Sequence, residues 1–146
     1  MKQCINSSGV LVCVTDQYSC ENLIKRGKSI ADEHKLPLSV LNVSPQNSGC
    51  NVNSDALQHL YNVSKQYGAP MSVIYNDDVS LITAGFICKN NITAIVTGMP
   101  KVEGMGFVYE LHTLLPDLKI YMLSSEDNVL RKLNPPKNKN RLAFNS

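Results

Sequence analysis

The sequence predicts an α/β protein with an open, five-stranded parallel sheet and helices on both of its faces. Two patterns support this fold class. Short apolar stretches alternate with longer stretches whose apolar residues recur at helical spacing, and the connections between them are short. The expected strands are 9–15, 38–43, 71–75, 92–97 and 118–123. The expected helices begin near Ser19, Ser54, Asp77 and Phe107.

The first half of the chain carries clear boundary signals. The run from Gly9 to Val14 is continuously apolar, as in a central parallel strand that is buried on both faces. Ser19 is expected to cap the first helix, and Pro37 ends that helix because proline lacks a backbone N–H. Turn-forming residues fill positions 44–53 after the second strand.

The second half repeats the alternation. Ser54 is expected to cap the second helix and Gly68 to follow its end. Asn76 and Asp77 are expected to cap the third helix. The fourth strand leads into a glycine-rich loop at 98–106, which precedes the fourth helix.

Length and charge bound the organisation of the chain. Its 146 residues, 43% of them hydrophobic, fit one domain, expected at 8–124. Residues 125–146 are expected to form a basic, flexible tail with a net charge of +3, and the remainder carries −1. A nearly neutral body gives no support for nucleic-acid binding.

The location and redox state follow from what the sequence lacks. Its apolar runs are too short to span a bilayer, and its start does not resemble a signal peptide. The five cysteines form no zinc-type spacing, and an odd count indicates free thiols. We therefore expect a cytoplasmic protein without a membrane partner.

A ligand of such a sheet is expected beyond the carboxyl ends of the strands. The candidate residues follow the first, second and fourth strands, and they are Thr15, Asp16, Gln17, Val43, Gly98 and Lys101. Glycine allows the backbone to approach a phosphate closely, and Lys101 adds a positive charge. No P-loop is present, and no GxGxxG motif follows the first strand.

The strand ends Val-Cys-Val-Thr-Asp, Leu-Asn-Val and Val-Thr-Gly resemble those of the universal stress protein family. Ser19–Gly27, Ile30–Glu33 and Asn91–Val96 resemble the universal-stress-like domain of KdpD-type potassium sensor kinases more closely. The resemblance covers about residues 9–124 and implies the strand order 3-2-1-4-5. It also implies an adenine nucleotide, ATP, AMP or cyclic di-AMP, as a ligand.

The resemblance assigns roles to some of these residues and also shows departures. Thr15, Asp16 and Val43 match positions that hold adenine and ribose, and Gly98 matches the first glycine of the ATP motif, whereas Lys101 replaces the second. In the cyclic di-AMP pattern, Thr15 and Gln17 keep hydrogen-bonding groups. Leu38 and Asn42 replace its two aromatic residues, so weak or absent cyclic di-AMP binding is expected.

Three functions follow from these patterns. The leading one is a non-catalytic sensor or regulatory protein that binds an adenine nucleotide and is linked to potassium or osmotic stress signalling, with a sensor kinase or potassium-transport regulator as partner. The alternative is an interaction module that has lost nucleotide binding. The third is a thiol-dependent enzyme using Cys20, because Cys20 and Arg26 match the phosphatase Cys-x5-Arg signature. A homodimer is expected because the fifth strand would be an unpaired apolar edge.

Overall fold

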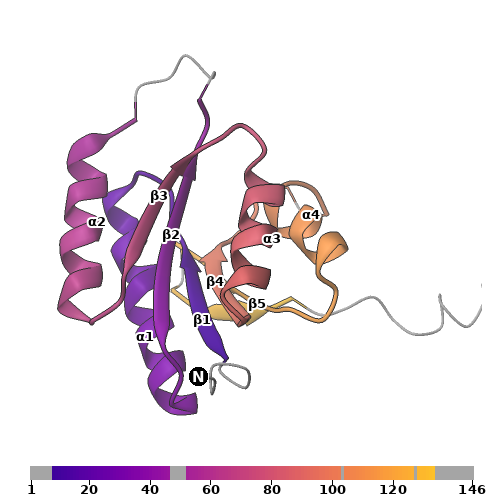
Figure 1. Ribbon diagram of the computed structural model, residues 1–146, viewed down its shortest axis with the longest axis horizontal. Helices are drawn as coiled ribbons and strands as arrows, with labels where there is room; N and C mark the ends of the chain where they lie inside the picture. The colour runs from indigo at the N-terminus through magenta and orange to yellow at the C-terminus, as the bar shows by residue number, and fades with distance from the viewer. Residues whose placement is uncertain (1–7, 47–51, 103, 127, 134–146) are drawn as a thin grey trace, which may run out of the picture.

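The computed structural model describes residues 8–46, 52–102, 104–126 and 128–133, and these form one sheet with helices on both faces (Figure 1). The strand order is β3-β2-β1-β4-β5-β6. The first five strands run parallel, and β6 pairs antiparallel with β5. The predicted α/β class and the predicted order of the five parallel strands are therefore confirmed.

The strands lie close to their expected positions. Their bounds are β1 Gly9–Cys13, β2 Leu38–Ser44, β3 Met71–Tyr75, β4 Ile92–Gly98, β5 Lys119–Leu123 and β6 Leu130–Lys132. β1 is central, and its residues from Gly9 to Val12 are buried. This burial on both faces explains why the strand reads as a continuous apolar run rather than an alternating one.

The helices form two layers. Their bounds are α1 Glu21–His34, α2 Ser54–Gln66, α3 Val79–Lys89 and α4 Phe107–Leu114, and a short 3-10 helix, η2, spans Tyr18–Cys20. Figure 1 shows α1 and α2 on one side of the sheet and α3 and α4 on the other. The chain adds strands on one side of β1 up to β3 and then continues on the other side with β4 and β5. Because each crossover between parallel strands is right-handed, the helices of the two halves lie on opposite faces.

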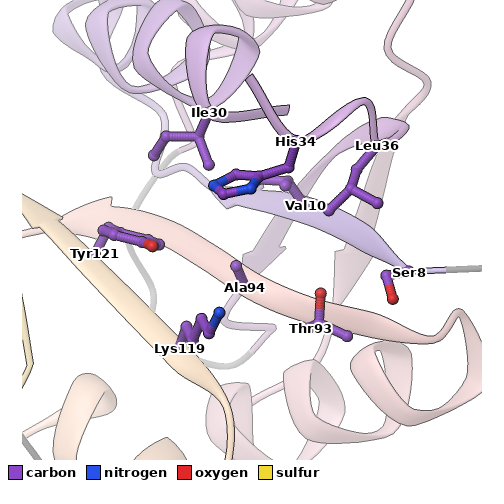
Figure 2. Close-up of a pocket in the computed structure, with 9 residues that line it drawn as sticks. All are labelled: Ser8, Val10, Ile30, His34, Leu36, Thr93, Ala94, Lys119 and Tyr121. Carbon is purple, nitrogen blue, oxygen red and sulfur yellow. The ribbon is translucent and has the colours of Figure 1, made fainter. Parts of the chain in front are cut away.

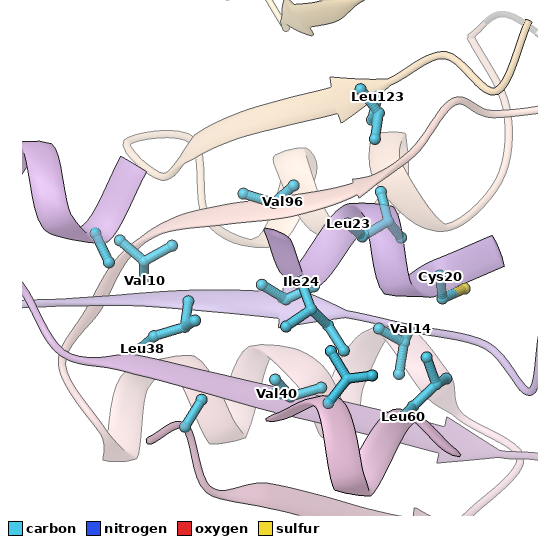
Figure 3. Packing of buried hydrophobic residues seen from close by; sticks show 14 residues of the cluster. Val10, Val14, Cys20, Leu23, Ile24, Leu38, Val40, Leu60, Val96 and Leu123 are labelled. Atoms are coloured by element: carbon cyan, nitrogen blue, oxygen red, sulfur yellow. The ribbon is translucent and has the colours of Figure 1, made fainter. Parts of the chain in front are cut away.

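The core has one part on each face of the sheet. Val10 and Val12 belong to the cluster of buried residues beneath α1 and α2, together with Ile24 and Leu60. Figure 3 shows Val10, Ile24 and Leu60 in this cluster. Leu11, the residue between Val10 and Val12, points toward α3 and α4. The alternation along β1 therefore supplies both cores from one strand.

The sheet differs from the expectation at its edge. β5 is not an unpaired edge strand, because Tyr121 to Leu123 pair with Lys132 to Leu130 of β6. The expected domain boundary at residue 124 falls between these two strands, and the described fold continues to Leu133. The argument for a homodimer through a free β5 edge is therefore wrong. The rest of the expected tail, 134–146, lies outside the described residues.

The helix caps also differ from the expectation. Cys20, not Ser19, is the N-cap residue of α1, because η2 leads directly into the helix. Asn53 caps α2 by accepting a hydrogen bond from the N–H of Ala56, and Asp78 caps α3. Each observed cap lies one or two residues from the expected one, and those of α2 and α3 use a side-chain oxygen, as the capping argument requires.

Candidate functional site

The carboxyl ends of β1, β2 and β4 lie side by side at one edge of the sheet, here called the carboxyl edge. Cys13 pairs with Leu41 of β2, and Val12 pairs with Val96 of β4. Thr15 and Val43 each lie two residues beyond the first of these pairs, and Val14 and Gly98 each lie two residues beyond the second. The topology thus brings the ends of the first, second and fourth expected strands to the centre of this edge, where small ligands bind in open α/β sheets.

The segment after β1 is the most polar part of this edge. Thr15 and Gln17 are exposed, and Asp16 is half-buried. The Asp16 carboxylate accepts the backbone N–H of Asn53 at 2.6 Å. A carboxylate has about four lone-pair positions, so Asp16 retains acceptor capacity for a ligand while it holds the start of α2.

Val43 and Gly98 occupy neighbouring strands, and Lys101 lies farther out. Val43 is half-buried and packs against the core beneath α3 and α4. Gly98 ends β4, and Lys101 is exposed in the following loop. No interaction in the described part of the chain joins Lys101 to the segment after β1.

The loop after β4 has an open glycine backbone. A Cβ atom added to Gly98 would meet no atom within 4 Å, so the space above this residue is free. Gly104 and Gly106 have φ angles of 85° and 96°, which side chains rarely adopt. Gly106 is the N-cap of α4 and provides no side-chain oxygen. The first N–H groups of α4 therefore have no capping side chain.

The same loop carries exposed apolar side chains. Met99, Val102 and Met105 are 41%, 57% and 65% exposed, and Leu81 at the start of α3 is 57% exposed. Methionine side chains adapt to irregular partners. This part of the carboxyl edge is thus suited to apolar contacts as well as to backbone contacts with an anion.

Asn42 is a functional candidate that the sequence reasoning did not identify as such. It is 2% exposed in the middle of β2. Its side-chain amide donates to the carbonyl oxygen of Val14 at 3.0 Å, and its Oδ1 accepts from the Ser44 hydroxyl at 2.7 Å. These bonds fix the ends of β1 and β2 relative to each other. An amide side chain between two apolar residues of β2, Leu41 and Val43, was the available signal.

Two carboxylates hold the ends of the β2–α2 connection. Asp77, after β3, accepts the backbone N–H of Gln46 at 2.8 Å, and Asp16, after β1, accepts that of Asn53. Asp77 was expected to cap α3, but it holds this connection and Asp78 caps the helix. The polar residues of the carboxyl edge therefore also organise its own backbone.

A group of charged residues joins α1 to α2 beside the site. His59 Nε2 lies 2.8 Å from Glu21 Oε1, and Lys25 Nζ lies 3.0 Å from Glu21 Oε2. The ring of Tyr18 lies 5.4 Å from that of His59. The hydrogen bond from His59 and the contact with Lys25 hold the pKa of Glu21 below its usual range.

The geometry at Cys20 does not support the hypothesis of a thiol-dependent enzyme. Residues 21–26 are helical, so they do not form the open loop of N–H groups with which a Cys-x5-Arg signature holds phosphate. Cys20 is buried, and its Sγ lies 3.4 Å from Thr15 Oγ1. Cys13 faces the core, and burial raises the pKa of its thiol to about 12, which disfavours the reactive thiolate.

The part of the chain that the structure describes contains neither a metal-type cluster nor a membrane-spanning helix. Within residues 8–46, 52–102, 104–126 and 128–133, no three His, Cys, Asp or Glu side chains gather in a way that could hold a metal ion. None of the helices in these ranges has both the length and the apolar character needed to cross a bilayer.

Comparison with known proteins identifies the fold. No protein-family model and no curated protein matches the sequence. Solved structures do match. A universal stress protein from Archaeoglobus fulgidus aligns with a TM-score of 0.59 and 14% identity over 80% of this chain and 92% of its own. The structure of the universal stress protein from Archaeoglobus fulgidus in complex with dAMP gives 0.56 and 13%, over 77% of this chain and 94% of its own.

A third structure agrees with these two. A protein from the universal stress protein family of Burkholderia pseudomallei aligns with a TM-score of 0.57 and 13% identity, over 84% of this chain and 98% of its own. This chain therefore has the universal stress protein fold, with a polar, glycine-bearing edge at the carboxyl ends of its strands.

Proposed function

We propose that this protein is a non-catalytic regulatory protein of the universal stress type that binds an adenine nucleotide at the carboxyl edge. The main observation in favour is the free space above Gly98, at the end of β4. β4 pairs with β1, the strand that leads into the polar segment at Thr15 and Asp16. The Archaeoglobus fulgidus universal stress protein, which shares this fold, has been solved in complex with dAMP.

The proposed arrangement divides the ligand between two strand ends. Thr15, Asp16 and Gln17 supply hydroxyl, carboxylate and amide groups that recognise a base and ribose by hydrogen bonds. The phosphate lies toward the loop after Gly98, where backbone N–H groups at the start of α4 and the Lys101 ammonium favour negative charge. Val43 supplies an apolar contact between them.

Calorimetric titration of the whole protein with ATP, AMP and cyclic di-AMP, with and without Mg²⁺, tests this proposal. We expect micromolar binding of a mononucleotide, and little or no binding of cyclic di-AMP, because Leu38 is 6% exposed and cannot stack on a base as an aromatic residue would. Gly98→Val fills the free space and should abolish binding. Gly85→Val, on an exposed face of α3 that also has no atom within 4 Å, is the matched control.

A second candidate function is a protein-interaction module without nucleotide binding. The exposed apolar side chains of Met99, Val102 and Met105 favour it, because they occupy the loop in which phosphate recognition would need polar groups. A folded protein that gives no heat with any of the nucleotides would support this candidate and contradict the first.

The signalling context is part of the same proposal. The resemblance of residues 9–124 to KdpD-type domains suggests a cytoplasmic role in potassium or osmotic stress signalling, with a sensor kinase or a potassium-transport regulator as partner. We propose that any self-association uses a surface other than β5, since β6 occupies that edge. Light scattering of the purified protein, with and without nucleotide, measures this directly.

A further inference from the structure

A groove with a volume of about 400 Å³ lies at the amino-terminal edge of the strands, opposite the carboxyl edge. It opens between the last two turns of α1 and the face of β4 and β5 on the same side of the sheet (Figure 2). The residues that decide its chemistry are Val10, Ile30, His34, Ala94, Lys119 and Tyr121. None of them belongs to the site proposed above.

The groove follows from the way the helices cover the sheet. α1 packs over β1, β4 and β2, and α2 packs against β3. Lys119 and Tyr121 are two residues apart on β5, so their side chains lie on the same face of the sheet. On this face Tyr121 is half-buried and Lys119 exposed, which leaves space between α1 and β5.

The floor of the groove is apolar, and its rim carries hydrogen-bond donors. Val10 and Ala94 form the floor with 0% and 6% exposure, and Ile30 adds an apolar wall. Figure 2 shows His34 and Lys119 reaching toward the same space from opposite walls. An ammonium group and an imidazole N–H both donate hydrogen bonds.

The charge of the groove has one sign. No Asp or Glu side chain lines it. In the described part of the chain, neither Lys119 nor His34 takes part in an ion pair. The Lys119 ammonium therefore lacks a carboxylate partner next to an apolar floor, a combination that suits a singly charged anion with an apolar body.

We propose that this groove binds a small organic anion in which a carboxylate is joined to an apolar chain. The carboxylate lies between Lys119 and His34, and the chain lies on Val10 and Ala94. A volume of about 400 Å³ is within the range of small-molecule sites. A phosphate ester fits less well, because its second negative charge would face only one permanently charged side chain.

The test uses the whole protein, labelled with ¹⁵N, and octanoate as the probe, with 1-octanol as a neutral probe of the same chain length. We expect octanoate to bind at least about tenfold more tightly than 1-octanol, the difference of one charge-assisted hydrogen bond. Amide shifts should concentrate at Thr93, Ala94 and Tyr121 and should leave Gly98 unchanged. Equal binding of the two probes, absence of octanoate binding, or shifts elsewhere would overturn the proposal.

Two variants locate the site. Lys119→Gln should weaken octanoate binding by about tenfold and leave 1-octanol binding unchanged. Lys65→Gln removes the same charge from an exposed position on α2 and should change the binding of neither probe. Ala94→Phe fills the groove and should stop both probes. If Ala94→Phe does not fold, Lys119→Gln decides alone, because Lys119 is exposed and its replacement should not disturb folding. An unchanged octanoate affinity in Lys119→Gln refutes the site.

Discussion

The carboxylate of Asp16 accepts the backbone N–H of Asn53 at 2.6 Å and so joins the end of β1 to the N-cap residue of α2. The residue that the proposed function assigns to a nucleotide therefore also has a structural role. Replacing it changes two things at once, and the two effects have to be separated by experiment.

Asp16→Ala should lower the free energy of unfolding by about 1 kcal/mol through the lost hydrogen bond, and it should also abolish nucleotide binding. Asn53→Ala is the matched control: it loses the cap of α2, at a cost of about 1 kcal/mol, but keeps the Asp16 carboxylate. Urea unfolding measures the first effect and calorimetry the second. Asn53→Ala keeps the backbone N–H that bonds to Asp16, so if it weakens the nucleotide as much as Asp16→Ala does, the loss in Asp16→Ala reflects a loosened start of α2 rather than a contact between the carboxylate and the nucleotide.

Asn42 should be among the most sensitive positions for stability. Asn42→Leu keeps the branched heavy-atom shape but leaves the Val14 carbonyl and the Ser44 hydroxyl without this partner in a buried place, so we expect a loss of about 2–4 kcal/mol in urea unfolding. Adding Ser44→Ala should restore about 1 kcal/mol, because it removes one unpaired group. A double variant less stable than Asn42→Leu alone would contradict this network.

Two helical glycines should respond in opposite directions to alanine. A Cβ at Gly27 of α1 would lie 2.3 Å from Val12 Cγ2, in the centre of the core. Gly27→Ala should therefore destabilise the protein by about 1–3 kcal/mol. Gly85 is exposed on α3, and a Cβ added to it would meet no atom within 4 Å. Gly85→Ala should therefore stabilise the protein by about 0.5–1 kcal/mol through helix propensity. Thermal unfolding of both variants tests the packing of α1 on β1.

The contact of Glu21 with His59 predicts a pH dependence of stability. The pKa of Glu21 is lowered from 4.5, first by the hydrogen bond with His59 and then by Lys25. The ionised carboxylate is thus favoured in the folded state. Its stabilising effect is present above about pH 4.5 and is lost as the pH falls through the lower, folded-state pKa.

Urea unfolding of the natural protein and of Glu21→Gln between pH 3 and pH 6 measures this effect. The difference in stability should shrink as the pH falls, and it should depend less on pH when His59→Gln is present in both proteins. A difference that is constant over this range would refute the role of the pair.

The parallel sheet was predictable because its central strands, β1 and β4, are largely buried and therefore apolar. β6 was not, because Leu130–Lys132 spans three residues, two of them charged, and its pairing depends on the distant β5. Cys20 replaces Ser19 as the N-cap of α1 for a similar reason, since η2 forms only when the chain turns from β1 into the helix.

The candidate site was predictable only in its location. Strand order places the ends of β1, β2 and β4 at one edge, so Thr15, Asp16 and Gly98 could be named from the sequence. The bond of Asp16 to Asn53 links residues that are 37 positions apart. The groove beside Lys119 depends on how far α1 extends over β4. Neither feature has a local signal in the sequence.

The most direct test of nucleotide binding at the carboxyl edge is to map AMP onto the ¹⁵N-labelled protein by its amide shifts. Saturable shifts at Thr15, Gly98 and Gly106, with Ala94 and Lys119 unaffected, are the result that the proposed function predicts. A folded protein whose amides do not move, or whose shifts fall only at the opposite edge of the sheet, would contradict it.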